Sequence, residues 1–173
     1  MNNGIETHRV WRVGADIDTD ALAPGAYMKF GIEEIARRCL HRQRAEFAAN
    51  VKPGDVIAAG PNFGIGSSRE QAPAAFVQLG VRAVIAPAFS GLFFRNAFNV
   101  GLVLLTCGQA EVLEEGERIA IDPLSGRITR TDGATLDCEP LPSFLLDMAE
   151  AGGLFNLLKK RYSVKEPRTH DTR

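Results

Sequence analysis

The feature that most constrains the fold is an alternation of short apolar runs with helical patterns between residues 56 and 106. Each apolar run has the length of a buried strand, and the segments between them carry apolar residues at helical spacing. The expected strands are 56–60, 82–86 and 102–106, and the expected helices are 72–79 and 89–99. The order βαβαβ predicts parallel strands with right-handed crossovers, and ligands that bind beyond the carboxyl ends of the strands.

Beyond residue 111 the chain changes to short alternating runs separated by turn sequences at 123–126 and 132–133. The proline, glycine and aspartate in these turns favour tight reversals and predict a β-meander. The last segment is helical in pattern but interrupted at Gly152 and Gly153, so we expect two short helices that cover the sheet. The expected elements are strands at 118–122, 127–131 and 135–139, and helices within 141–160.

The N-terminal part predicts a strand near 8–13, a loop rich in aspartate and a helix near 32–40. The fold class is therefore α/β, with a βαβαβ parallel unit followed by a β-meander and C-terminal helices. A chain of 173 residues, 45% of them hydrophobic, has the size and core of one domain. We expect a single domain over 1–165 and a flexible C-terminal tail over 166–173.

The charge balance is nearly neutral, because 20 Lys and Arg residues stand against 21 Asp and Glu residues. This balance gives no electrostatic footprint for nucleic acid or for an acidic membrane surface. No segment approaches the roughly 20 apolar residues of a membrane span, and the polar start of the chain lacks the apolar stretch of a secretory signal. We therefore expect a cytoplasmic protein whose partner is a small molecule or another protein.

The cysteines Cys39, Cys107 and Cys138 lie far apart and form no Cys-x-x-Cys pair. Their odd number and spacing argue against a disulfide framework and against a structural zinc site. We expect all three to be small buried hydrophobic side chains. An iron-sulfur cluster needs several thiolates, often close in sequence, so this chain alone is a poor host for one and no metal site is expected in it.

The most informative loop is 63–70, which places two glycines, two hydroxyls and a guanidinium between an expected strand and an expected helix. Glycine lets the backbone approach a ligand, and amides at a helix start attract anions. The expected ligand is a carboxylate, which Arg69 can bind by two parallel hydrogen bonds. The alternative is that Ser67 and Glu70 form a capping box and nothing binds. Pro73 argues against that box and for a helix that begins near Pro73.

Other interpretations of this loop fail on specific residues. A dinucleotide fingerprint needs glycine or alanine where Glu70 stands, and a phosphate-binding P-loop needs a Gly-Lys-Ser or Gly-Lys-Thr ending. A hydrolase nucleophile elbow would read Gly-x-Ser-x-Gly. The histidines, which such a triad would also need, all lie outside the βαβαβ unit, at His8, His41 and His170.

A second candidate is the acidic loop 16–20, whose alternating carboxylates look like a calcium loop. A calcium-binding EF-hand needs glycine at its sixth position and glutamate at its twelfth, where this chain has Ala21 and Tyr27. Calcium is therefore rejected. The structural alternative is an acidic turn that caps the strand before it.

Together these segments resemble the small subunit of 3-isopropylmalate dehydratase and the matching domain of aconitase and homoaconitase. The segments that carry the resemblance are 16–20, 24–29, 62–70, 96–102, 122–126 and 152–154. The resemblance implies a swivelling β/β/α domain that closes over a large subunit carrying a four-iron four-sulfur cluster. It also implies a hydro-lyase, inactive alone, that isomerises 2-isopropylmalate and 3-isopropylmalate by dehydration and rehydration in leucine biosynthesis.

The resemblance also assigns roles to individual residues. Ser67 matches the base that removes a proton from the substrate carbon, and local amides and positive charge would stabilise its alkoxide. Ser68 and Arg69 would bind a substrate carboxylate. Thr19 and Asp20 match residues that line the same cleft.

Lys29 falls in the loop that, by the resemblance, selects the substrate, where arginine accompanies an extra carboxylate and an apolar residue accompanies an alkyl group. Lysine is ambiguous, because its stem packs against alkyl groups while its ammonium meets carboxylates. The alternative is a solvated surface lysine. Two residues depart from the family pattern: Gln71 replaces a histidine, and Ile65 replaces a frequent cysteine. Glutamine cannot carry a proton near neutral pH as histidine can.

These departures leave two further hypotheses open. The first keeps the chemistry and changes the small hydroxy-dicarboxylate, giving a related dehydratase for methylmalate and citraconate, for dimethylmalate or for homoaconitate. The second is a non-catalytic paralogue that binds an anion without turnover. In each enzymatic interpretation the partner is a large, cluster-bearing dehydratase subunit.

Overall fold

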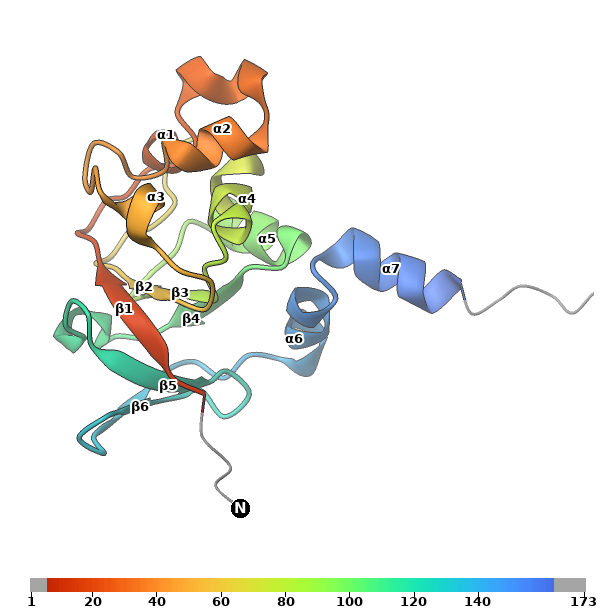
Figure 1. The fold of residues 1–173 in the computed structure, drawn as a ribbon. Helices are drawn as coiled ribbons and strands as arrows, with labels where there is room; N and C mark the ends of the chain where they lie inside the picture. The colour runs from red at the N-terminus through yellow and green to blue at the C-terminus, as the bar shows by residue number, and fades with distance from the viewer. Residues whose placement is uncertain (1–5, 164–173) are drawn as a thin grey trace, which may run out of the picture.

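The computed structural model describes residues 6–163, which form one seven-stranded sheet in the order β4-β3-β2-β1-β5-β6-β7 (Figure 1). Strands β1 to β4 are parallel, and β1 pairs with β5 in the antiparallel sense. The strands are β1 (His8–Arg12), β2 (Val56–Ala58), β3 (Ala83–Ala86), β4 (Val103–Thr106), β5 (Arg118–Asp122), β6 (Arg127–Arg130) and β7 (Thr135–Asp137). The predicted βαβαβ unit and the predicted meander are both confirmed.

The parallel strands carry apolar side chains on both faces because both faces are covered. Every residue of β2 and β3 is buried, and Ile57, Val84 and Leu104 lie in register across β2, β3 and β4. The meander strands β5 and β6 instead each bury one residue, Ile119 and Ile128, and leave the others half-buried or exposed. Continuous burial thus marks the covered half of the sheet, and partial burial marks the half with one face in solvent.

The two crossover helices lie on one face of the parallel strands and contact each other. They are α4 (Gln71–Gln78) and α5 (Gly91–Val100). Helix α5 ends at Gly101, whose φ of 89° places it in the left-handed region and confirms the predicted stop. The remaining short helices are α1 (Thr19–Leu22), η1 (Gly25–Phe30), α2 (Ile32–Arg37), α3 (Phe47–Asn50) and η2 (Ala110–Val112).

An aromatic cluster fills the layer between these helices and the sheet. The ring of Phe63 lies 6.2 Å from that of Phe76 and 5.4 Å from that of Phe93, and Phe76 lies 6.0 Å from Phe47. All four side chains are nearly or fully buried, which stabilises the fold by about 1.5–3 kcal/mol for each ring. Because Phe63 begins the glycine-rich loop, this cluster anchors that loop to the core.

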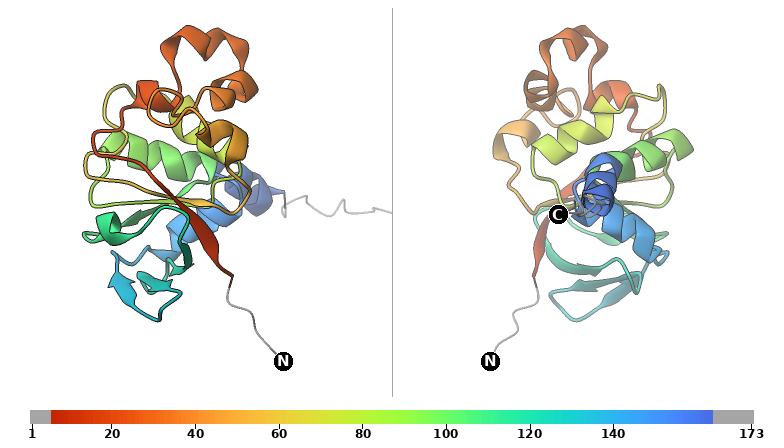
Figure 2. Two further views of the ribbon diagram at one scale, coloured as in Figure 1. Left: turned by 60° about the vertical axis from the view of Figure 1, so that its left-hand side comes forward. Right: turned by 90° about the vertical axis from the view of Figure 1, so that its right-hand side faces the viewer.

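The sheet curls into a half-barrel, so that strands at opposite ends of the strand order approach each other. The backbone N–H of Glu139, just beyond β7, donates to the carbonyl of Thr106 at the end of β4, at 2.8 Å. In both views of Figure 2 the meander lies on the side of the parallel strands away from α4 and α5. The meander therefore covers the face of the parallel strands that the crossover helices leave open.

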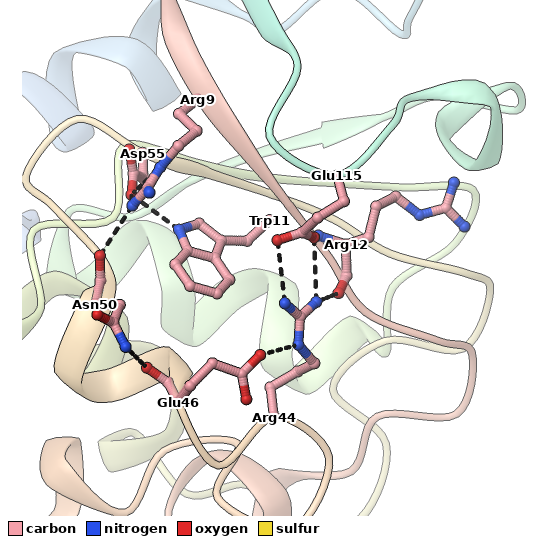
Figure 3. Close-up of polar contacts among 8 residues, drawn as sticks. All are labelled: Arg9, Trp11, Arg12, Arg44, Glu46, Asn50, Asp55 and Glu115. Atoms are coloured by element: carbon pink, nitrogen blue, oxygen red, sulfur yellow. Dashed lines mark hydrogen bonds and ion pairs between the residues drawn. The ribbon is translucent and has the colours of Figure 1, made fainter.

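Strand β1 belongs to both halves of the sheet, and a polar network fixes it (Figure 3). Arg44 donates to Glu115 at 3.0 Å and to the carbonyl of Arg12 at 2.6 Å. The indole of Trp11 donates to the buried carboxylate of Asp55 at 2.9 Å, and the guanidinium of Arg9 donates to the same oxygen. These contacts join β1 to the segments that precede β2 and β5.

The net effect of this network on Asp55 is a pKa below the ordinary value of 3.8. Burial is the largest single cause and raises the pKa, because it disfavours the charged form. The hydrogen bonds from Arg9, from the backbone N–H of Lys52 and from Trp11, together with the positive charge of Arg9, outweigh burial. Asp55 is therefore held as a carboxylate in the folded protein.

The C-terminal segment forms two helices, α6 (Ser143–Glu150) and α7 (Leu154–Tyr162), as predicted. The break is also confirmed, since Gly152 and Gly153 have φ values of 73° and 110°. The expectation that both helices cover the sheet is wrong for α7, which contacts α5 and α6 and buries no residue. Phe155 and Tyr162 are 68% and 71% exposed.

Two further expectations concern membrane-spanning helices and the boundary between the domain and its tail. Among residues 6–163, no helix combines the length and the apolar content needed to cross a membrane. The predicted boundary between the domain and its tail, at residues 165 and 166, lies outside the described residues.

Candidate functional site

Two loops meet beyond the carboxyl ends of β1 and β2, and backbone hydrogen bonds join them. The N–H of Gly64 donates to the carbonyl of Ile17 at 2.7 Å, and the N–H of Thr19 donates to the carbonyl of Ile65 at 2.8 Å. These bonds form an isolated parallel bridge between Asp18 and Ile65. The acidic loop and the glycine-rich loop, about 45 residues apart in sequence, thus form one surface at the edge where parallel sheets bind ligands.

Glycine is required twice in this surface. Gly64 has a φ of 80°, and a Cβ atom there would lie 2.2 Å from Cγ of Phe93. Gly66 has a φ of 105°, and its Cβ would lie 3.0 Å from the hydroxyl oxygen of Thr19. The left-handed backbone conformation disfavours a larger residue at both positions, and at Gly64 the close approach to Phe93 excludes one.

The hydroxyls of Ser67 and Thr19 are neighbours in this surface. Their oxygen atoms lie 3.2 Å apart, and the backbone N–H of Ser67 donates to the Thr19 hydroxyl oxygen at 3.0 Å. Thr19 is 3% exposed, whereas Ser67 is exposed to solvent. The buried threonine therefore holds the exposed serine in a fixed position.

Arg69 and Asp20 form an ion pair beside this serine. Nη1 of Arg69 donates to Asp20 at 2.9 Å and to the carbonyl of Ala23 at 2.9 Å, while the backbone N–H of Gly25 donates to Asp20 at 2.9 Å. The hydrogen bond from Arg69 is the main reason that the pKa of Asp20 lies below its ordinary value. The pair is part-exposed, so solvent screens its contribution to stability.

The other two aspartates of the acidic loop have structural partners. Asp18 caps α1 by accepting a hydrogen bond from the N–H of Ala21 at 2.7 Å. Asp16 accepts one from the side chain of Asn62 at 2.9 Å, and both of these residues have positive φ, 55° and 60°. The three carboxylates of the loop thus face separate partners instead of converging on one cation.

The structure also decides between the two interpretations of the 63–70 loop. Helix α4 begins at Gln71 without a side-chain cap, so the capping box of Ser67 and Glu70 does not form. Pro73 falls in the first turn, where its missing N–H costs nothing, which agrees with a helix that begins near Pro73. The irregular loop before α4 leaves Ser67 and Ser68 on the surface, and Asn96 of α5 donates to the carbonyl of Ser68 at 2.9 Å.

The remaining predicted residues lie at the margins of this surface. Lys29 is exposed on η1, and its ammonium lies 5.0 Å from the centre of the Phe30 ring. It makes no hydrogen bond or ion pair with the part of the chain that the structure describes. Gln71 is exposed at the start of α4. The structure thus brings Thr19, Asp20, Ser67, Ser68 and Arg69 together, and it does not bring Lys29 into contact with them.

A hollow of about 300 Å³ adjoins Asp20, and Ser67 does not line it. Its walls include His41 and two arginines, Arg38 and Arg42, which the sequence analysis did not consider. The closeness of the two arginines in sequence was the available signal, because positive charges that close together attract anions. Ser67 itself stands on an open surface, so the described chain supplies one wall of a site and not an enclosed pocket.

No set of three histidine, cysteine or carboxylate side chains that could hold a metal ion occurs among residues 6–163. Cys39, Cys107 and Cys138 are free, and the prediction that all three are buried is confirmed. These residues do not fit an iron-sulfur cluster, because a cluster needs converging thiolates.

Comparison with known proteins places this geometry in a family. A model described as the aconitase C-terminal domain matches residues 42–110. The 3-isopropylmalate dehydratase small subunit of Thermodesulfovibrio yellowstonii is 42% identical over 161 residues, covering 91% of this chain and 96% of the relative. The methanogen homoaconitase small subunit of Methanothermobacter thermautotrophicus is 44% identical over 156 residues, covering 88% of this chain and 90% of the relative.

A solved structure agrees with these relatives. The crystal structure of a 3-isopropylmalate dehydratase from Methanocaldococcus jannaschii superposes with a TM-score of 0.84 at 40% sequence identity, covering 91% of this chain and 95% of that one. Identity and coverage of this extent show common fold and descent. The chain belongs to the aconitase family, among the 3-isopropylmalate dehydratase small subunits and their close relatives.

Proposed function

We propose that this chain is the small subunit of a 3-isopropylmalate dehydratase, a hydro-lyase that isomerises 2-isopropylmalate and 3-isopropylmalate by dehydration and rehydration. The observation that carries the proposal is the pairing of the exposed Ser67 hydroxyl with the buried Thr19 hydroxyl, 3.2 Å apart, beside Arg69. The relatives named as 3-isopropylmalate dehydratase small subunits support the choice of reaction.

In this proposal Ser67 takes the proton from the substrate carbon next to the one that bears the hydroxyl. A serine alkoxide is a strong base that must be stabilised to exist near neutral pH. Thr19 can do this, because its oxygen already accepts from the Ser67 N–H and its own proton is free to be donated to the Ser67 oxygen. The guanidinium of Arg69 adds positive charge nearby.

Arg69 and Ser68 would bind a substrate carboxylate. Both hydrogen bonds that the Arg69 side chain makes within residues 6–163 use Nη1, so Nη2 and Nε remain for a ligand. Asp20 and the carbonyl of Ala23 hold the guanidinium plane in place, which lowers the entropy lost when a carboxylate binds. The ion pair with Asp20 therefore orients Arg69 for a substrate carboxylate.

The proposal places the rest of the site on a large subunit. Ser67 and Ser68 lie on an open surface, and a partner must cover them to exclude water from the reaction. That subunit would carry the four-iron four-sulfur cluster, since residues 6–163 of this chain offer no ligand set for one, and the cluster would act as a Lewis acid toward the substrate hydroxyl. The isolated chain would then be inactive.

The substrate is the least constrained part of the proposal. One relative, from Methanocaldococcus jannaschii, is named an isopropylmalate/citramalate isomerase small subunit, at 42% identity, and another is named a homoaconitase small subunit. Lys29, exposed on η1, is the residue proposed to select among small hydroxy-dicarboxylates. The free state of the three cysteines fits the reducing cytoplasm, where we place the protein.

The test is turnover of the chain reconstituted anaerobically with its large subunit, followed by absorbance of the unsaturated intermediate. Isopropylmalate, citraconate and homoaconitate are offered separately, and the preferred diacid identifies the substrate. Ser67→Ala should lower kcat by about 100-fold or more, because it removes the base. The matched control is Ser125→Ala, which changes a serine on the β5–β6 turn and should retain full activity.

Loss of activity in both serine variants would show damage to the fold and not loss of a base. No turnover of any of the three diacids, despite a stable complex with an intact cluster, would reject the proposal. That result would instead favour a non-catalytic paralogue that binds an anion.

A further inference from the structure

The half-barrel has a seam where β4 and β7, the two outer strands in the strand order, approach each other. One backbone hydrogen bond crosses it, from the N–H of Glu139 to the carbonyl of Thr106. Cys107 follows Thr106, and Cys138 precedes Glu139, so the two cysteines flank this bond. Two of the three cysteines of the chain, 31 positions apart in sequence, thus lie where a backbone hydrogen bond joins the ends of the two outer strands.

The contacts across the seam place the two cysteines opposite each other. The thiol of Cys107 donates to the carbonyl oxygen of Asp137, in the peptide group that joins Asp137 to Cys138, at a sulfur–oxygen distance of 3.6 Å. Together with the Glu139 to Thr106 bond, this gives an antiparallel register in which residue 107 faces residue 138. Opposed residues of antiparallel segments have Cα atoms about 4.5–5.5 Å apart, which is within the range that a disulfide spans.

The chemical environment distinguishes this pair from the third cysteine. The neighbouring thiol of Cys138 lowers the pKa of Cys107 to about 7, and Cys107 in turn raises the pKa of Cys138. Burial alone raises the pKa of Cys39. Cys138 keeps 9% of its surface exposed and Cys107 keeps 1%, whereas Cys39 keeps none, so a small oxidant reaches the pair from the Cys138 side of the seam. A thiolate is the form of cysteine that reacts.

We propose that Cys107 and Cys138 form a reversible dithiol–disulfide pair that covalently closes the seam of the half-barrel. The oxidant is a peroxide. The Cys107 thiolate attacks one oxygen of hydrogen peroxide, which gives a sulfenic acid and hydroxide, and hydroxide takes up a proton to form water. The Cys138 thiol then attacks the sulfenic sulfur and releases a second water, so that two thiols and one peroxide yield one disulfide and two waters. A small-molecule dithiol reverses the reaction.

This site is independent of the proposed dehydratase chemistry, because neither cysteine touches the Ser67 surface. The disulfide would join the end of β4 to the end of β7 and enclose the whole meander. It would limit the freedom of the unfolded chain, and we expect the melting temperature of the full chain to rise by about 5 °C or more on oxidation.

The test is mapping of thiols and disulfides in the full-length chain before and after brief treatment with equimolar hydrogen peroxide. Trypsin releases Cys107 in peptide 96–118, Cys138 in peptide 131–159 and Cys39 in peptide 39–42. We expect free thiols to fall from three to one, and a linked pair of peptides 96–118 and 131–159 that dithiothreitol separates. Because this mapping uses the unaltered chain, it does not depend on whether a variant folds.

Three variants sharpen the result. Cys107→Ser and Cys138→Ser should each abolish the linked peptides and the rise in melting temperature, whereas Cys39→Ala should preserve both. Retention of all three thiols under peroxide would overturn the proposal. A disulfide to Cys39, or one between two chains, would overturn it as well, because either would show that the seam does not direct the pairing.

Discussion

The hydroxyl oxygen of Thr19 lies 3.2 Å from that of Ser67 and accepts a hydrogen bond from the Ser67 N–H at 3.0 Å. A buried residue of the acidic loop thus fixes an exposed residue of the glycine-rich loop, and Gly66 provides the space for it. This contact joins the acidic loop and the glycine-rich loop into one candidate site.

Replacing Thr19 with valine tests that contact, because valine keeps the shape and removes the hydroxyl. We expect kcat of the assembled enzyme to fall about tenfold or more, since the Ser67 alkoxide loses a donor, with little change in KM. Thr19→Ser keeps the hydroxyl and should retain most of the activity. Steady-state kinetics of both variants check this. A loss of activity in Thr19→Ser without one in Thr19→Val would mean that the methyl group of Thr19, and not its hydroxyl, is what matters.

Alanine at Gly64 should destabilise the fold by about 2–4 kcal/mol, because it adds left-handed backbone strain to a clash with Phe93. The matched control is Gly14→Ala, where a Cβ atom meets nothing within 4 Å. That control should change the free energy of unfolding by less than about 1 kcal/mol. Urea denaturation measures both values. Similar stabilities for the two variants would contradict the close packing of the loop against α5.

The depressed pKa of Asp55 predicts that stability falls in acid. A carboxylate whose pKa is lowered on folding stabilises the protein above its unfolded pKa, and the effect is lost as pH falls through the folded pKa. The free energy of unfolding should therefore decrease as the pH falls below 3.8, the ordinary pKa of an aspartate. Asp55→Asn should lower stability at about pH 6 and flatten the loss between about pH 4 and pH 2.

Urea midpoints measured across that pH range test the Asp55 prediction. Asp147→Asn serves as the control, because Asp147 is a half-exposed carboxylate on α6 that should contribute little. If Asp55→Asn lost stability in acid as steeply as the unaltered protein, other carboxylates would be the cause of that loss.

Gln71→His restores the residue that the family pattern leads us to expect, at an exposed position at the start of α4. We expect activity to be unchanged or raised, because histidine can carry a proton near neutral pH and glutamine cannot. The pH dependence of kcat is the second measurement, and a new ionisation near the ordinary histidine pKa would show that the imidazole takes part. A large loss of activity would show that the glutamine has a role of its own.

The sequence was sufficient for the elements whose signals are local. Apolar runs predicted β2, β3 and β4, turn residues predicted the meander, and Gly101 marked the end of α5. The placement of α7 could not be predicted, because its apolar residues Phe155 and Tyr162 indicate burial while the fold leaves them exposed. A helical pattern specifies an apolar face but not the surface, if any, that the face meets.

The candidate site divides in the same way. The residue types and glycine spacing of the 63–70 loop predicted an anion-binding surface from local chemistry, and the family resemblance supplied the role of Ser67 as a base. Only the tertiary structure decided that Thr19 reaches Ser67, that Asp20 holds Arg69, and that Cys107 reaches the Asp137 carbonyl beside Cys138. Contacts between distant segments depend on strand order and on the curl of the sheet, and these arise from the packing of the whole chain and not from any one stretch of it.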